Sequence, residues 1–261
     1  MKKNTLNYAD VSVIIPYFNS ENTIKRCLDS VINQSLPVRE VIIVDDGSTN
    51  KLWLPDFLKK YNCNRIKLIQ QENKGAASAR NLAISYSTSK YIAFLDSDDT
   101  WHKEKIKIQY EYMQKNDIFL SAHGYLSNSQ NYDSHFNKPK TKKIKKILFI
   151  KGSLFNTPTV MVKAKYFLPF DTRLQCSEDY KCWIENYSNG TYAYICTNLA
   201  NGFKTPIGES GLSGNIPKMH KEYKKALKLL LKEKSISVIY YLTAIFIEKI
   251  KYPIRYLIFS K

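Results

Sequence analysis

Short apolar runs alternate with segments of helical periodicity over the first 120 residues, and this alternation constrains the fold more than any other feature of the chain. The apolar runs have the length of buried strands: they are residues 11–15, 41–44, 66–69 and 91–95. The segments between them space their apolar residues as helices do: they are residues 21–34, 52–61 and 75–86. Strand–helix alternation at this interval predicts an α/β fold with a mostly parallel, doubly wound sheet and flanking helices.

The second half of the chain is less regular. It contains two further strand-like runs, a helical segment closed by Asn-Gly, and a basic helical segment; these are residues 159–162, 192–195, 178–187 and 217–234. We expect one α/β domain over residues 1–215, followed by a basic, amphipathic helical extension over residues 216–261.

Charge and cysteine usage narrow the class of protein. The chain has a net charge of +17, and residues 121–261 carry 23 Lys and Arg against 9 Asp and Glu. Such a surplus predicts an acidic partner such as membrane lipid, nucleic acid or a phosphorylated substrate, unless lysine serves only as solubilising surface. Five cysteines without a Cys-x-x-Cys pair indicate a reducing compartment. The polar residues after Met1 predict no signal peptide.

The C-terminal tail has the composition of a membrane-interface helix. Residues 236–247 contain no charge, and residues 248–259 mix Lys and Arg with aromatic and aliphatic side chains. The uncharged run is too short to span a bilayer, which needs about 20 apolar residues. A helix of this kind either lies in the membrane interface or packs on the domain as an ordinary amphipathic helix. We favour the interface, because the preceding basic helix would attract anionic lipid.

Polar clusters follow the predicted strands or open the predicted helices. They are residues 16–19, 45–48, 73–81 and 96–99. The carboxyl ends of parallel strands lie along one edge of a sheet, so these clusters should meet in one crevice. Asp96, Asp98 and Asp99 would repel one another at a strand end, and a hard divalent cation such as Mg²⁺ or Mn²⁺ would remove that cost. The alternative is an acidic turn that caps a helix starting near Lys103.

Together the four clusters resemble glycosyltransferase family 2. The matching segments are Val-Ser-Val-Ile-Ile-Pro-Tyr-Phe-Asn (11–19), Val-Asp-Asp-Gly-Ser (44–48), Asn-Lys-Gly-Ala-Ala-Ser-Ala-Arg-Asn (73–81) and Phe-Leu-Asp-Ser-Asp-Asp (94–99). The resemblance is dense over residues 10–100 and continues thinly to Glu178-Asp179 and to residues 210–213. It implies the GT-A fold, a nucleotide-sugar half over residues 1–120, an acceptor half over residues 121–215, and inverting transfer from a nucleoside-diphosphate sugar.

The resemblance also implies roles for individual residues. The nucleotide-sugar-binding residues would be Pro16, Tyr17, Asn19, Glu21, Asp45, Asp46, Lys74, Gly75, Arg80, Asp96 and Ser97. Pro16 and Tyr17 would lie against the base, and Asp45 or Asp46 would accept the uracil imide N–H. Arg80 would grip the diphosphate or the base, and Asp96 would bind ribose or a metal-bound water.

The metal ligands implied by the resemblance are Asp98 and Asp99, holding Mn²⁺ or Mg²⁺. Asp179 would be the general base for the acceptor hydroxyl, with Glu178 supporting it or binding the acceptor. Each cluster also has a purely structural interpretation. Asp45 and Asp46 suit an Asp-Gly turn, Gly75 a helix start, Arg80 an exposed helix cation, and the Glu178-Asp179 pair a helix N-terminus.

One segment departs from the family pattern. The aromatic–Arg pair usual before the Gly/Ser loop is replaced here by Phe203-Lys204, which puts an arginine contact to the diphosphate at that point in doubt.

The function expected from the sequence is metal-assisted transfer of a sugar, from a UDP-sugar in particular, to a hydroxyl of a glycan or lipid-linked oligosaccharide. Bacterial surface polysaccharide or O-antigen synthesis at the inner face of the cytoplasmic membrane is the expected setting, with no nucleic acid partner. A nucleotidyltransferase of related fold and a basic nucleic-acid-binding module are the alternatives. A dinucleotide-binding dehydrogenase is excluded, because the first glycine of the chain is Gly47.

Overall fold

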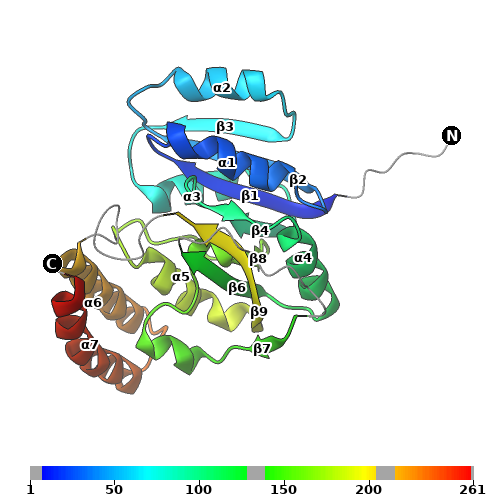
Figure 1. Ribbon diagram of the computed structural model, residues 1–261. Helices are drawn as coiled ribbons and strands as arrows, with labels where there is room; N and C mark the ends of the chain where they lie inside the picture. The colour runs from blue at the N-terminus through cyan, green and yellow to red at the C-terminus, as the bar shows by residue number, and fades with distance from the viewer. Residues whose placement is uncertain (1–7, 128–138, 204–214, 260–261) are drawn as a thin grey trace.

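A computed structural model describes residues 8–127, 139–203 and 215–259 (Figure 1). The strands are β1 (Ala9–Tyr17), β2 (Val38–Asp46), β3 (Ile66–Gln71), β4 (Tyr91–Phe94), β5 (Thr100–Trp101), β6 (Leu120–Ser127), β7 (Thr141–Lys143), β8 (Met161–Lys163) and β9 (Tyr192–Gly202). The α-helices are α1 (Glu21–Ile32), α2 (Trp53–Tyr61), α3 (Ala76–Ser85), α4 (Lys105–Lys115), α5 (Glu178–Glu185), α6 (Ile216–Lys232) and α7 (Val238–Phe259). The 3₁₀-helices described are η1 (Lys146–Lys151), η2 (Thr157–Thr159) and η3 (Asn186–Asn189).

The strands described form one sheet in the order β3-β2-β1-β4-β8-β6-β9-β5, with β7 paired to β9. The first four strands are parallel, as the alternation predicts. Beyond β4 the sheet is mixed, because β8 runs antiparallel to both β4 and β6. The sequence did not reveal β6, whose buried Ser121 and His123 interrupt the apolar run that marks a strand of this kind.

Helices cover both faces of the sheet, so the parallel strands have apolar side chains on both sides. On β1, Val13 and Ile15 pack into one core cluster and Ile14 packs into the other. The first cluster draws on α1, α2 and α4, and the second on α3, α5, α6 and α7. This explains why β1 and β2 are near-continuous apolar runs rather than alternating ones.

The C-terminal segment forms two helices that lie side by side, and α6 packs against α5 while α7 packs against η1 (Figure 1). Tyr240 and Ala244 of α7 are buried against the second core cluster. Much of the remaining surface of α7 is exposed, including Ile239 and Phe246. Over residues 8–127, 139–203 and 215–259, no helix combines the length and apolarity needed to cross a bilayer.

Candidate active site

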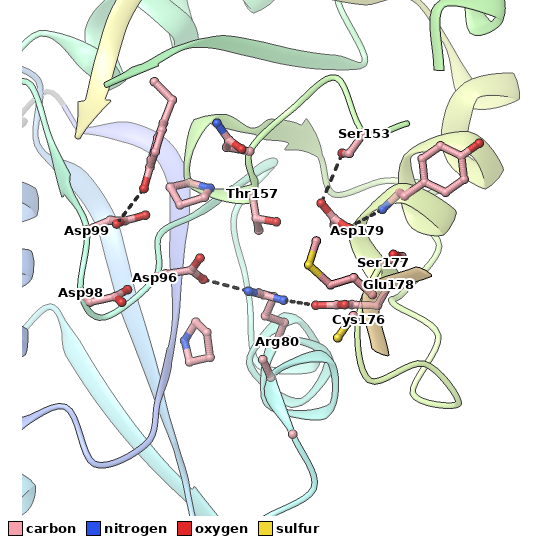
Figure 2. A pocket seen from close by; sticks show the side chains of 18 of the residues that line it. Arg80, Asp96, Asp98, Asp99, Ser153, Thr157, Cys176, Ser177, Glu178 and Asp179 are labelled. Carbon is pink, nitrogen blue, oxygen red and sulfur yellow. Dashed lines mark hydrogen bonds and ion pairs between the residues drawn. The ribbon is translucent and has the colours of Figure 1, made fainter. Parts of the chain in front are cut away.

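A cavity of about 870 Å³ opens where the carboxyl ends of β1, β2 and β4 face the start of α5 (Figure 2). The predicted site residues that line it are Pro16, Tyr17, Asp46, Gly75, Arg80, Asp96, Ser97, Asp98, Asp99, Glu178 and Asp179. The other predicted residues, Asn19, Glu21, Asp45 and Lys74, lie outside the lining described. Residues 210–213 and Lys204 fall outside the described residues. The sheet edge therefore brings all four sequence clusters to one cavity.

Asp45 and Asp46 are adjacent in sequence but serve different partners. Asp45 is buried, and its Oδ1 accepts the backbone N–H of Ser48 at 3.0 Å, closing an Asp-Gly turn. Asp46 reaches the next loop: its Oδ1 accepts the Lys74 N–H and its Oδ2 the Gly75 N–H, both at 2.8 Å. Asp46 is thus the member of the pair that faces the cavity, and it fixes the backbone from which α3 begins.

Two glycines give these loops their shape. Gly47 has a φ of +74°, and a Cβ added there would lie 2.6 Å from the backbone nitrogen of Asn73. Gly75 precedes α3 with a φ of +88°, a conformation that L side chains rarely adopt. Gly75 is therefore a helix start and a lining residue of the cavity at once.

Asn19 ties the loop after β1 to the loop after β2. Its backbone N–H donates to the Oγ of Ser48 at 3.0 Å, and its Oδ1 accepts the Thr49 N–H at 2.9 Å. Its φ of 45° is in the left-handed region, which asparagine tolerates better than most residues. Asn19 acts by positioning the strand-end loops.

Arg80 is the centre of the site rather than an exposed helix cation. Its guanidinium donates to Asp96 at 2.8 Å and to Glu178 at 3.0 Å (Figure 2). It also lies 5.4 Å from the ring centroid of Phe170. Burial alone would lower the pKa of Arg80, but the two carboxylates raise it. Arg80 thereby joins the first half of the chain to α5, with each of its two terminal nitrogens donating to a different protein carboxylate.

The three aspartates after β4 point to different partners. Asp96 faces Arg80, whereas Asp99 accepts the hydroxyl of Tyr125 at 3.1 Å (Figure 2). The backbone carbonyl of Asp98 accepts Arg26 at 2.9 Å, and its side chain lines the cavity. Within the described residues no three or more His, Cys, Asp and Glu converge as a metal site.

The helix-capping interpretation of this acidic loop is wrong. β5 intervenes between the aspartates and α4, which begins at Lys105 after Glu104. The aspartates therefore lie too early in the chain to satisfy the first N–H groups of that helix.

The Glu178-Asp179 pair begins α5, facing the aspartate loop across the cavity. The preceding Ser177 has a φ of 63°, a strained value for serine. Glu178 is held by Arg80, while Asp179 Oδ2 accepts the Ser153 hydroxyl at 3.3 Å. Burial and the neighbouring charge of Glu178 raise the pKa of Asp179 to about 6. Asp179 is therefore able to take up a proton near neutral pH.

Sequence reasoning missed the wall formed by the end of η1, the loop after it, and α7. The lining residues there include Lys151, Gly152, Ser153, Lys251 and Arg255. The one available signal is the spacing of Lys251 and Arg255, which puts two cations on one helix face. Nothing in the sequence shows that this face turns toward the strand ends.

Comparison with solved structures defines the fold. The chain superposes on Staphylococcus aureus TarS 1–349 in complex with UDP with a TM-score of 0.68, covering 96% of this chain and 72% of that one at 22% identity. With a cavity at the strand ends of a mixed α/β sheet, this is the GT-A fold.

The family follows from the sequence. The model of glycosyl transferase family 2 matches residues 12–168, and the chain belongs to that family. It is 32% identical to the Escherichia coli "UDP-Glc:alpha-D-GlcNAc-diphosphoundecaprenol beta-1,3-glucosyltransferase WfgD", over 89% of this chain and 90% of the relative. It is 34% identical to the putative teichuronic acid biosynthesis glycosyltransferase TuaG of Bacillus subtilis, over 70% of this chain and 74% of the relative.

Membership of this family favours the glycosyltransferase over the two alternatives that the sequence left open, a nucleotidyltransferase and a nucleic-acid-binding module. The chain is therefore a glycosyltransferase enzyme, and the expected GT-A fold and family are confirmed.

Proposed function

We propose that the protein transfers a sugar from a UDP-sugar to a hydroxyl of a polyprenyl-diphosphate-linked glycan, with inversion. The main support is that one cavity has, on one side, the strand ends whose residues are expected to bind the nucleotide sugar and, on the other side, Asp179. The name of WfgD specifies a UDP-glucose donor and a diphosphoundecaprenol-linked acceptor, which supports the same two substrate classes.

On the donor side, Asp46 is the better candidate for the uracil imide. A carboxylate offers about four lone-pair directions, and Gln71, Lys74 and Gly75 occupy three of those of Asp46. One direction remains for a base N–H, on the oxygen that accepts Gly75. Pro16 and Tyr17 line the cavity nearby and would contact the base.

Asp98 is the candidate ligand for a divalent cation, because it lines the cavity on the loop that follows β4 and carries a carboxylate. Hard oxygen donors suit Mg²⁺ or Mn²⁺, which commonly take one or two protein carboxylates and fill other positions with phosphate oxygens and water. When bound, such a cation would neutralise charge on the leaving diphosphate. Asp98→Ala should raise the Mn²⁺ concentration that gives half-maximal activity; an unchanged metal dependence would contradict this assignment.

On the acceptor side, Asp179 would remove the proton of the attacking hydroxyl. Its position at the cavity wall, its hydrogen bond from Ser153 and its raised pKa suit a general base. Glu178 is paired with Arg80, and it would thereby keep the neighbouring Asp179 carboxylate in place.

The test is donor binding followed by transfer. A thermal-shift screen with Mn²⁺ should show stabilisation by UDP and UDP-sugars and less by GDP, because a ligand that binds the folded state raises Tm. Transfer from the stabilising UDP-sugar to a sugar-diphosphate-lipid acceptor is then measured by release of UDP. Stabilisation by GDP-sugars alone, or UDP release without a glycosylated lipid, would contradict the proposal.

We infer further that α7 places the enzyme on an anionic membrane surface. An apolar stripe runs along its exposed side, with every member more than half exposed: Ile239, Leu242, Phe246, Ile250 and Leu257. Exposed lysines of the neighbouring α6, such as Lys224 and Lys228, supply the charge that attracts anionic lipid. The occupant that fits both features is a lipid bilayer carrying negative charge.

Flotation with vesicles tests this attachment. Leu242→Ser/Phe246→Ser should lose binding to phosphatidylglycerol vesicles, whereas Leu52→Ser, an exposed apolar change on the far side of the fold, should bind as the wild type does. Truncation of α7 is unsuitable, because the helix also lines the cavity. Retained flotation would contradict the proposal, and concentration-dependent dimerisation lost in the double variant would indicate a second copy on the stripe instead.

A further inference from the structure

The cavity wall opposite the strand ends carries three cationic side chains that the proposed binding of the sugar donor does not use. Lys151 ends η1, and Lys251 and Arg255 lie four residues apart on one face of α7. Glu248 lines the same region and pairs with Arg255, and it also lies 2.8 Å from Nδ1 of His220. Glu248 is thus paired with Arg255 and also acts electrostatically on Lys251.

The environment of these cations is that of an anion site. Burial lowers the pKa of Lys251, and the positive charges of Arg255 and Lys151 lower it further against the opposing effect of Glu248. The Nε of Arg255 is buried and has no hydrogen-bond partner among the described residues. An anion placed between the three side chains would relieve their repulsion and supply acceptors for their donors.

A three-residue segment fixes the distance between this cluster and the candidate base. The ammonium of Lys251 donates to the carbonyl of Lys151 at 2.5 Å, and the hydroxyl of Ser153 donates to Asp179 at 3.3 Å. The Cα atoms of Lys151 and Ser153 are at most about 7 Å apart, because they are two residues apart in the chain. In a sugar whose anomeric carbon carries a diphosphate, the hydroxyls and the first phosphate are separated by no more than the width of the sugar ring. One acceptor can therefore reach both the three cations and Asp179.

The orientation of α7 agrees with an acceptor of this kind. The same helix presents Lys251 and Arg255 to the cavity and exposes Leu242 and Phe246 elsewhere on its surface. A lipid tail held at the apolar stripe would therefore deliver its head group to the cation-bearing face. The donor's own diphosphate is expected at the opposite wall, near Asp98.

We propose that Lys151, Lys251 and Arg255 bind the diphosphate of the lipid-linked acceptor. The inference rests on the proposed function for its acceptor class and adds which side chains recognise it. The ligand is a diphosphate diester that joins a sugar to a polyprenol, and the part recognised is the diphosphate.

Steady-state kinetics with two acceptors test the proposal. One acceptor carries a short alkyl diphosphate on the anomeric oxygen of its sugar, and the other is the alkyl glycoside of that sugar without phosphate. Lys251→Gln should raise KM for the diphosphate acceptor about tenfold or more, as expected for loss of a charged hydrogen bond. It should change kcat/KM for the phosphate-free glycoside and KM for the UDP-sugar less than about twofold.

Lys249→Gln is the matched control, because Lys249 is exposed on the same helix and is not part of the cavity lining described. Lys151→Gln and Arg255→Lys extend the series, the latter keeping a cation beside the buried Glu248. Equal losses with both acceptors would show a merely structural role and overturn the proposal. A raised KM for the UDP-sugar would show that the cluster binds the donor diphosphate instead.

Direct binding separates this inference from the proposed function. Geranyl diphosphate, titrated in the presence of saturating UDP and Mn²⁺, should bind the wild type and Lys249→Gln and bind Lys251→Gln at least tenfold more weakly. If Lys251→Gln binds geranyl diphosphate more weakly but the wild type has no transferase activity, the anion site is supported and the proposed reaction is overturned. If the wild type is an active transferase but Lys251→Gln binds geranyl diphosphate as tightly as the wild type does, the proposed reaction is supported and the anion site is overturned.

Discussion

The two walls of the cavity are built in different ways. At the strand ends, Asp45 and Asp46 accept backbone N–H groups of Ser48, Lys74 and Gly75, so the loop backbones define the shape. The opposite wall depends on side chains of distant segments, such as Lys251, which reaches the carbonyl of Lys151. Arg80 joins the two walls through carboxylates on each.

This difference explains where sequence motifs succeed. A wall made by loop backbones needs particular residues at fixed spacing, such as Asp-Asp-Gly-Ser and Asn-Lys-Gly, and these appear as motifs. A wall made by packed helices needs only charges of suitable reach, which any basic amphipathic helix supplies. The first wall should therefore tolerate side-chain changes outside its motifs, while the second should respond to single charges.

The largest effect should come from the base on the second wall. Asp179→Asn should lower kcat by about 10²–10⁴-fold, the range for loss of general-base catalysis, with donor binding unchanged. Since the pKa of Asp179 is raised to about 6 and the base must be ionised, wild-type activity should fall as pH drops through about 6. Rates from pH 5 to 8 measure this limb.

Ser153→Ala is the matched control for Asp179→Asn, because it removes one hydrogen bond and leaves the carboxylate. Its activity should stay within about tenfold of wild type. Transfer by Asp179→Asn at the wild-type rate would show that another group accepts the proton.

The next effect tests the link between the walls. Arg80→Met should destabilise the fold by about 3 kcal/mol, because it leaves the buried Glu178 and the partly buried Asp96 without their shared cation. Urea unfolding at pH 7 measures the free energy of unfolding. Arg80→Lys should recover part of the loss, and a change within about 0.5 kcal/mol for Arg80→Met would mean that the two walls are held together by packing alone.

A smaller effect on stability is expected from Glu40, which lies near the start of β2, at the opposite end of the strand from Asp46. Burial would raise the pKa of Glu40, but hydrogen bonds from Lys67, Ser12 and Thr88 outweigh it and lower the pKa to about 2. A lowered folded-state pKa stabilises above the unfolded value of about 4.5, and the contribution is lost as pH falls toward about 2.

Glu40→Gln should therefore cost about 2 kcal/mol at pH 7 and progressively less below pH 4.5. Chemical unfolding of both proteins between pH 3 and 7 gives the difference. A pH-independent difference would contradict the assigned cause, and Glu104→Gln, a change at an exposed surface pair with Ser35, is the control.

The smallest effect concerns the first wall. Lys74→Ala should change donor affinity by less than about twofold, because the wall uses the backbone N–H of Lys74. Asp46→Ala, which removes the acceptor of that N–H and of Gly75, should weaken UDP binding about tenfold or more. Calorimetric titration with UDP compares them, and a larger effect of Lys74→Ala would show that its side chain contacts the nucleotide, in agreement with the nucleotide-sugar-binding role that the family resemblance implies.

Much of the first half could be predicted from sequence, because β1, β2 and β4 are buried on both faces and thus appear as apolar runs. β6 could not, since Ser121 and His123 are buried polar residues that interrupt its apolar run; Gln109 donates to the Ser121 hydroxyl, and Nδ1 of His123 lies 2.9 Å from the Gly124 carbonyl. The tail helix α7 was predicted, but its contribution of Lys251 and Arg255 to the cavity wall was not. Helical periodicity in α7 indicates that cations and apolar side chains occupy different faces, and says nothing of what each face meets.

By itself the sequence determined the parallel first half of the sheet, the family, and the meeting of four clusters at one edge, because strand and loop geometry follow from local residues. Tertiary structure alone decided that Asp46 rather than Asp45 faces the cavity, that Arg80 binds Asp96 and Glu178, and that Lys251 and Arg255 complete the wall. Those facts depend on how separately formed elements pack, and side-chain contacts between residues about 100 positions apart leave no local pattern.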